Sequence, residues 1–237
     1  MNVVVAWICF QCFFEFLRLS KINTSRIFPS VFLGTAQFFL LNFLNYKNYF
    51  LCSTALAFII VSYFLIIKVP VKQLSGILTA LLVCLFAFPH LSFIRNFSSA
   101  NISNISLIIF VVVVTELNDV FQYLMGKFFG KHKIVPAISP NKTLEGFIGG
   151  VLLTVLLSNI LGFFLLKSSF TASTLIGAAL GISGFCGDVF MSYLKRKSGI
   201  KDTGNLLPGH GGLLDRMDSL IFNAPLFFWL IPLFLKN

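Results

Sequence analysis

The sequence predicts an all-α protein, a polytopic bundle of about eight helices that span a membrane. Apolar residues make up 57% of the 237 residues, and only 11% are charged. The mean hydropathy of +0.91 is too high for a globule that stays soluble in water. The apolar residues also form runs close to the roughly 20 residues that a helix needs to cross a bilayer.

Eight such runs are expected to be the spanning helices. They cover residues 2–18, 29–46, 50–67, 74–94, 104–126, 144–166, 173–194 and 213–235. The clearest breaks between them are polar or contain proline, as in residues 20–30 and 68–73. The first run has neither a basic start nor an A-x-A cleavage site, so we expect it to be retained as a spanning helix.

Basic residues are divided unequally between the two sides of the membrane. Loops after odd-numbered helices carry 14 lysines and arginines, whereas the other side carries 4. Because basic loops stay inside, the first set is expected to face the cytoplasm, with both termini outside. The formal net charge of +10 is therefore explained by membrane topology, and we expect no nucleic-acid partner.

Acidic residues are few, and seven of the eight lie after residue 100. An unpaired charge within a membrane helix costs at least about 2.5–3.5 kcal/mol, so such residues are kept chiefly where they face partners, water or an ion. Helical spacing predicts three polar faces at the cytoplasmic ends of their helices, which can converge on one cavity. The faces are Glu116, Asp119 and Tyr123; Asp188, Ser192 and Lys195; and Asp215 with Asp218 on a helix that starts near Leu213.

The polar loop, residues 195–216, lies between two apolar runs. Its basic residues suit phosphate oxygens, its carboxylates suit Mg²⁺, and its glycines let a backbone come close to a ligand. The basic half alone is equally typical of a solvated cytoplasmic loop. The acidic half favours a site, because carboxylates contribute little to topology. We therefore divide the chain into four scaffold helices over 1–100 and a catalytic membrane domain over 101–237.

A turn over residues 139–142 precedes the sixth apolar run, with Thr143 as the expected N-cap of that helix. Lys142 beside the positive helix end indicates an anion site. The alternative is simple helix initiation with one lysine that reaches back to the membrane surface.

These motifs carry a resemblance to the phosphatidate cytidylyltransferases. The longest reads Ser192-x-Leu194-Lys195-Arg196-x4-Lys201-Asp202-x-Gly204-x2-Leu207-Pro208-x-His210-Gly211-Gly212-Leu213-x-Asp215-Arg216-Met217-Asp218 and is similar to the family signature. Residues 139–146, 187–196 and 118–123 resemble three further family segments. The similarity covers about 104–235. Asn118 and Gln122 depart from the family pattern, and the chain is shorter than is usual, which leaves one N-terminal helix unaccounted for.

The resemblance implies transfer of CMP from CTP to phosphatidate, giving CDP-diacylglycerol and pyrophosphate, with Mg²⁺ as one ion or two. It implies metal ligands at Asp188, Asp215, Asp218 and Asp119. The implied catalytic residues are Asp188, Lys195, Arg196, Lys201, Asp202, His210, Asp215, Arg216 and Asp218. The implied substrate-binding residues are Ser139, Asn141, Lys142, Thr143, Glu145, Ser192, Gly211 and Gly212. The expected setting is a bacterial inner membrane with the site facing the cytoplasm, and a homodimer is one possible assembly.

Other functions fit parts of the pattern. One alternative is a CTP-dependent kinase of a lipid alcohol, or a cytidylyltransferase for another phospholipid. A transporter with intramembrane carboxylates is a third hypothesis. The sequence disfavours it, because the acidic residues gather at one membrane face instead of at midplane.

Overall fold

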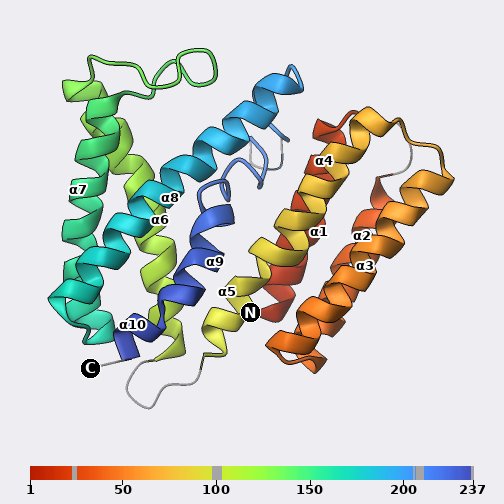
Figure 1. Ribbon diagram of the computed structural model, residues 1–237, viewed down its shortest axis with the longest axis horizontal. Helices are drawn as coiled ribbons and strands as arrows, with labels where there is room; N and C mark the ends of the chain where they lie inside the picture. The colour runs from red at the N-terminus through yellow and green to blue at the C-terminus, as the bar shows by residue number, and fades with distance from the viewer. Residues whose placement is uncertain (23–25, 98–102, 205, 207–210, 236–237) are drawn as a thin grey trace. The chain divides into compact units, whose positions relative to one another are not determined.

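The computed structural model describes residues 1–22, 26–97, 103–204, 206 and 211–235. Within these ranges the chain is helical and forms no strand, and an isolated bridge joins Lys133 and Thr143. The prediction of an all-α polytopic bundle is confirmed (Figure 1).

The helices follow the apolar runs closely. The elements are α1 (Asn2–Leu19), α2 (Ile27–Phe43), α3 (Tyr46–Ile66), α4 (Val71–Leu81), the π-helical turn η1 (Leu82–Ala87), α5 (Pro89–Arg95), α6 (Asn104–Phe129), α7 (Leu144–Leu161), the π-helical turn η2 (Gly162–Leu166), α8 (Phe170–Lys197), α9 (Leu220–Leu230) and α10 (Pro232–Leu235).

Six helices among the described residues are long and apolar enough to cross a membrane, and Ile27–Phe43 and Leu220–Leu230 are shorter apolar helices. Large apolar side chains are exposed along them, including Phe58 at 74% and Leu152 at 65% of their surface. Proteins that are soluble in water rarely expose so much apolar surface, so the chain is a multi-pass membrane protein. The count of eight spans stays a prediction.

Two compact units make up the chain. The first contains Met1–Phe93 and Leu194–Met217, and the second contains Ile94–Tyr193 and Asp218–Asn237. The polar loop therefore packs within the first unit, together with the N-terminal helices. The division of roles between scaffold helices over 1–100 and a catalytic domain over 101–237 stays a prediction.

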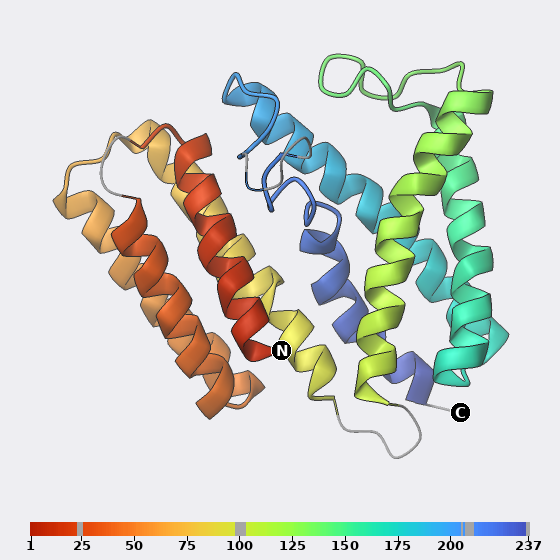
Figure 2. The same ribbon diagram turned by 180° about the vertical axis from the view of Figure 1, so that it is seen from behind.

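In the first unit, α1 lies beside α2 and α4 (Figure 2). The turn η1 places its carbonyl oxygens where polar side chains can reach them, as π-helical turns do. Gln37 Nε2 donates to Cys84 O at 2.9 Å, and the Tyr49 hydroxyl lies 2.9 Å from Leu85 O and 2.8 Å from Gln37 Oε1. These buried hydrogen bonds fix how α2, α3 and η1 pack.

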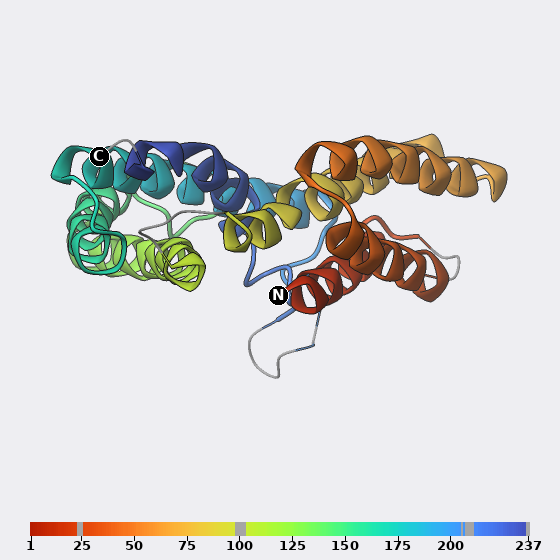
Figure 3. The same ribbon diagram turned by 90° about the horizontal axis from the view of Figure 1, so that it is seen from below.

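In the second unit, α6 and α7 pack closely side by side (Figure 3). A Cβ atom added to Gly146 would lie 2.8 Å from Gln122 O, so only glycine permits this approach. Buried Asn118 accepts a hydrogen bond from Thr154 at 2.9 Å, and Asn223 donates to Thr115 at 2.9 Å. The apolar helices are thus joined by a small number of buried amide and hydroxyl contacts.

One helix boundary was predicted wrongly. The last helix begins at Leu220, and residues 213–219 form turns and bends instead of its first two turns. Asp215 and Asp218 therefore do not share a helical face. The cause lies in the contacts of the loop, because the Asp215 carboxylate binds backbone N–H groups of Thr203 and Gly212 and so favours a turn over a helix.

Candidate active site

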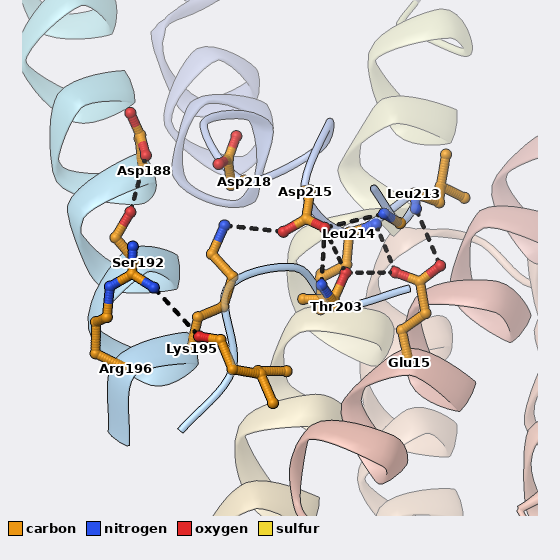
Figure 4. Close-up of polar contacts among 12 residues, drawn as sticks. Glu15, Asp188, Ser192, Lys195, Arg196, Thr203, Leu213, Leu214, Asp215 and Asp218 are labelled. Carbon is orange, nitrogen blue, oxygen red and sulfur yellow. Dashed lines mark hydrogen bonds and ion pairs between the residues drawn. The ribbon is translucent and has the colours of Figure 1, made fainter. Parts of the chain in front are cut away.

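Asp215 is the centre of a polar cluster in the first unit (Figure 4). Its Oδ1 atom forms an ion pair with Lys195 Nζ at 2.8 Å, and both side chains are largely buried, at 8% and 13% exposed. Its Oδ2 atom accepts from the backbone N–H groups of Thr203 at 2.8 Å and Gly212 at 2.9 Å. Burial raises the pKa of Asp215, but these donors outweigh burial and hold the pKa below its usual value.

Glu15 in α1 holds the same loop from the other side. It is 2% exposed, and its carboxylate accepts from Leu213 N at 2.9 Å, Leu214 N at 2.9 Å and Gln11 Nε2 at 2.9 Å. The Thr203 hydroxyl lies 2.8 Å from Glu15 Oε2 and 3.0 Å from Asp215 Oδ2, so its single proton serves one carboxylate at a time. Two carboxylates and one lysine thus fix the loop (Figure 4).

The sequence interpretation missed Glu15 because it treated the first four helices as scaffold. The signal was present, since Glu15 is the one acidic residue in the first 100 and lies within an apolar run. The energetic argument applied to Asp188 holds equally for Glu15.

The glycines of the loop let its backbone approach these carboxylates. A Cβ atom on Gly212 would collide with Glu15 Oε2 and Thr203 Oγ1, and one on Gly204 would lie 3.1 Å from Glu15 Oε1. Gly211 has φ of +84°, which glycine adopts without strain. Gly211 and Gly212 approach protein carboxylates in the structure, and their approach to a substrate stays a prediction.

A pocket of about 180 Å³ lies in the second unit, and seven predicted residues meet at or beside it. Asp119 comes from α6 and Asp188 from α8, and Lys142 forms an ion pair with Asp188 Oδ2 at 2.5 Å. Ser192 Oγ donates to Asp188 Oδ1 at 3.3 Å, one helical turn away. The remaining pocket residues from the prediction are Ser139, Asn141 and Thr143.

The loop over 130–143 is held in place from α7. Thr143 is the N-cap of α7, as predicted, and its Oγ1 atom accepts from Gly146 N at 3.1 Å. The Glu145 carboxylate accepts from the backbone N–H groups of Lys131 at 2.9 Å and His132 at 3.1 Å, and it contacts His132 Nδ1 at 2.6 Å. Glu145, expected to bind substrate, therefore ties down the loop that carries Lys142.

The other predicted residues belong to both units. Lys201, Asp202 and Arg216 are exposed in the first unit. Arg196 is also exposed and donates to Ile200 O at 3.3 Å. Asp218 belongs to the second unit, where its Oδ1 atom accepts from Ser219 N at 2.9 Å. His210 lies outside the described residues.

Carboxylates in the second-unit pocket fit a Mg²⁺ ion in part. Among the described residues, no group of three His, Cys, Asp or Glu side chains is close enough to hold a metal unaided. However, Mg²⁺ usually takes one or two carboxylates and completes its shell with phosphate oxygens and water. Asp119 and Asp188 line one pocket, and Asp119 Oδ1 is buried without a partner in the described part of the chain. Asp215, in contrast, has both oxygens bound by protein donors.

Comparisons with known proteins give a consistent result. Residues 1–234 match the model of the Cytidylyltransferase family. The chain is 48% identical over 158 residues to the protein of Escherichia coli K12 called uncharacterized protein YnbB. This alignment covers 66% of this chain and 53% of that protein. The chain is 36% identical over 173 residues to the phosphatidate cytidylyltransferase of Staphylococcus epidermidis RP62A, and 37% identical over 174 residues to that of Staphylococcus aureus COL. Each of these two alignments covers 73% of this chain and 65% of the relative, so the chain spans between half and two thirds of the curated relatives it matches.

Proposed function

The chain belongs to the cytidylyltransferase family, and from this membership we propose that it transfers CMP from CTP to phosphatidate, giving CDP-diacylglycerol and pyrophosphate. The resemblance to the phosphatidate cytidylyltransferases is confirmed by the relatives that carry this name. The observation that carries the proposal is the second-unit pocket, where a lysine and two carboxylates face one space.

The reaction needs little from the protein beyond charge and position. A phosphate monoester is already ionised near pH 7, so its oxygen attacks the α-phosphorus of CTP without a general base. A P–O bond forms to the lipid phosphate as the bond to pyrophosphate breaks. The activation barrier then comes mainly from bringing the negative charges of the two phosphate groups together. Cationic side chains and a metal ion lower this barrier.

Lys142 is the proposed contact for the phosphates of CTP. It pairs with Asp188 at 2.5 Å, and its Nζ atom also lies 4.5 Å from the centre of the Phe185 ring. A triphosphate that enters the pocket competes for this ammonium group and so frees Asp188. At about 180 Å³ the pocket is smaller than the ~300 Å³ at which typical ligand sites begin, which suits part of a triphosphate better than a whole nucleotide.

Asp119 and Asp188 would hold Mg²⁺ in this pocket, with Ser219 and Ser192 orienting their carboxylates. The ion, when bound, would supply positive charge to the transferred phosphoryl group and the leaving pyrophosphate. The Asp215 cluster has a different proposed role. Its internal ion pair and hydrogen bonds fix the polar loop, which carries the exposed Lys201 and Arg216 as proposed contacts for an anionic substrate.

The proposed setting is the cytoplasmic face of a bacterial inner membrane. Fourteen basic residues on the odd-numbered side support this orientation.

Labelled CTP tests the proposal directly. Purified protein with phosphatidate and Mg²⁺ is expected to place an α-phosphate label in the lipid, and a chelator is expected to stop the reaction. A γ-phosphate label in the lipid would instead indicate a CTP-dependent lipid kinase. Ion or solute flux in proteoliposomes without CTP turnover would indicate a transporter. Either result would overturn the proposed function.

A further inference from the structure

A second pocket, of about 440 Å³, lies within the first unit and carries an excess of positive charge. It is formed where α1 ends, where α4 begins and where α8 ends. Lys21, Lys72 and Lys197 line it, one from each segment, and no acidic side chain is among its described lining residues.

The three lysines are available to an anion. None of the pocket lysines takes part in an ion pair within the described part of the chain. All three side chains are exposed. Three like charges around one space repel each other, and an anion bound between them removes this cost.

Backbone contacts fix Lys21 between the end of α1 and the start of α4. Lys21 follows α1 with φ of +56°, in the left-handed region where glycine is the favoured residue. Its N–H donates to Arg18 O at 3.0 Å, and its carbonyl accepts from Gln73 Nε2 at 3.2 Å. The second contact ties the end of α1 to the start of α4. The Lys21 side chain therefore lies at the junction of these two helices, in the lining of the pocket.

The rest of the lining combines hydroxyl groups with apolar surface. Hydroxyl groups donate to phosphate oxygens, whereas apolar side chains suit the glycerol and first methylenes of a lipid. The hydroxyl-bearing residues are Ser20, Ser75, Thr79 and Ser198, and the apolar ones are Phe16, Leu19 and Leu194.

The position of the pocket along its helices favours a lipid. Asn2–Leu19 and Val71–Arg95 are candidate membrane spans, and the pocket lies at the last turn of the first and the opening turns of the second. The ends of spanning helices lie at the depth of lipid head groups, where lysines bind anionic lipids. We propose that this pocket binds the phosphate group of an anionic membrane lipid. The proposal does not depend on the proposed transfer reaction, because its test measures binding and not turnover.

A triple variant tests the proposal. Lys21→Gln, Lys72→Gln and Lys197→Gln are combined in the full chain, and Lys47→Gln, Lys133→Gln and Lys167→Gln form the matched control. The three control lysines are exposed and lie outside the pocket lining, and their substitution removes the same amount of positive charge. Binding of phosphatidate, phosphatidylglycerol and phosphatidylcholine to the detergent-solubilised protein is measured by native mass spectrometry, and thermal unfolding checks that each variant is folded.

The wild type and the control are expected to retain the two anionic lipids in preference to phosphatidylcholine. The triple variant is expected to bind them about 100-fold more weakly, since each of the three lysines near an anionic lipid contributes about fivefold. Equal lipid affinity of the triple variant and the control would overturn the proposal. Displacement of the lipid by millimolar inorganic phosphate would show a site for a free anion and would also overturn it. If the triple variant does not fold, Lys72→Gln alone is expected to weaken binding about fivefold.

Discussion

Replacing Glu15 with glutamine should loosen the polar loop. The Glu15 carboxylate is 2% exposed and accepts from two adjacent backbone N–H groups, those of Leu213 and Leu214. Glutamine keeps one acceptor oxygen but turns an NH₂ group toward the other N–H. One buried donor is then left without a partner, which costs about 1–3 kcal/mol, and the remaining bonds lose the strength that the charge gave them.

We therefore expect Glu15→Gln to destabilise the loop by about 2–3 kcal/mol, and Glu15→Ala by about 3–5 kcal/mol because both N–H groups lose their acceptor. Since 1.4 kcal/mol is a factor of ten, amide exchange at Leu213 and Leu214 should accelerate about 30- to 100-fold in the glutamine variant. Hydrogen exchange of the purified protein, read on peptides that cover residues 211–216, measures this effect.

Glu145→Gln is the matched control, because Glu145 also accepts from two backbone N–H groups but belongs to the second unit. It should accelerate exchange at residues 131 and 132 and leave residues 213 and 214 unchanged. Wild-type exchange rates at Leu213 and Leu214 in Glu15→Gln would refute the reasoning, since another contact would then be holding the loop.

Three further predictions follow from the same contacts. The folded pKa of Asp215 is lowered, so its contribution to stability is present above its unfolded pKa of about 3.9 and is lost as the pH falls through the folded value. The difference in stability between wild type and Asp215→Asn, measured by thermal unfolding from pH 7 to pH 3, should therefore shrink at the acid end. A constant difference would contradict this. Gly212→Ala should lower stability by about 1–3 kcal/mol, because its methyl group meets the carboxylate beneath the loop; an unchanged unfolding temperature would show that the loop shifts without cost. Lys142→Gln should lower CTP turnover at least about tenfold and raise KM for CTP, whereas a change in KM for phosphatidate alone would assign Lys142 to the lipid.

The helices were predictable because each follows from an apolar run of the right length. The relative positions of polar side chains were predictable where both side chains belong to one helix, as for Asp188 and Ser192 one turn apart in α8. The Thr143 cap also followed from local sequence. The family resemblance identified Lys142 and Asp188 as site residues, and the structure shows them paired in one pocket.

The contacts of the polar loop were not predictable from local sequence. The turn at 213–219 depends on where the Asp215 carboxylate finds its donors, and those come from Thr203 and Gly212. The role of Glu15 depends on residues almost 190 positions later, which no helical period reveals. Spacing on one helix is informative, but spacing across a loop rich in glycine leaves too many backbone conformations open.

The link between Glu15 and Thr203 bridges 188 positions of the chain. A ribosome that adds roughly 5–20 residues per second needs about 10–40 s to make the second partner after the first. For that interval α1 carries a carboxyl group whose hydrogen-bond donors in the polar loop have not yet been synthesised. Assembly of the first unit is therefore expected to finish only after residues 203–214 have emerged, and a nascent chain that stops earlier leaves the Glu15 carboxylate without these donors.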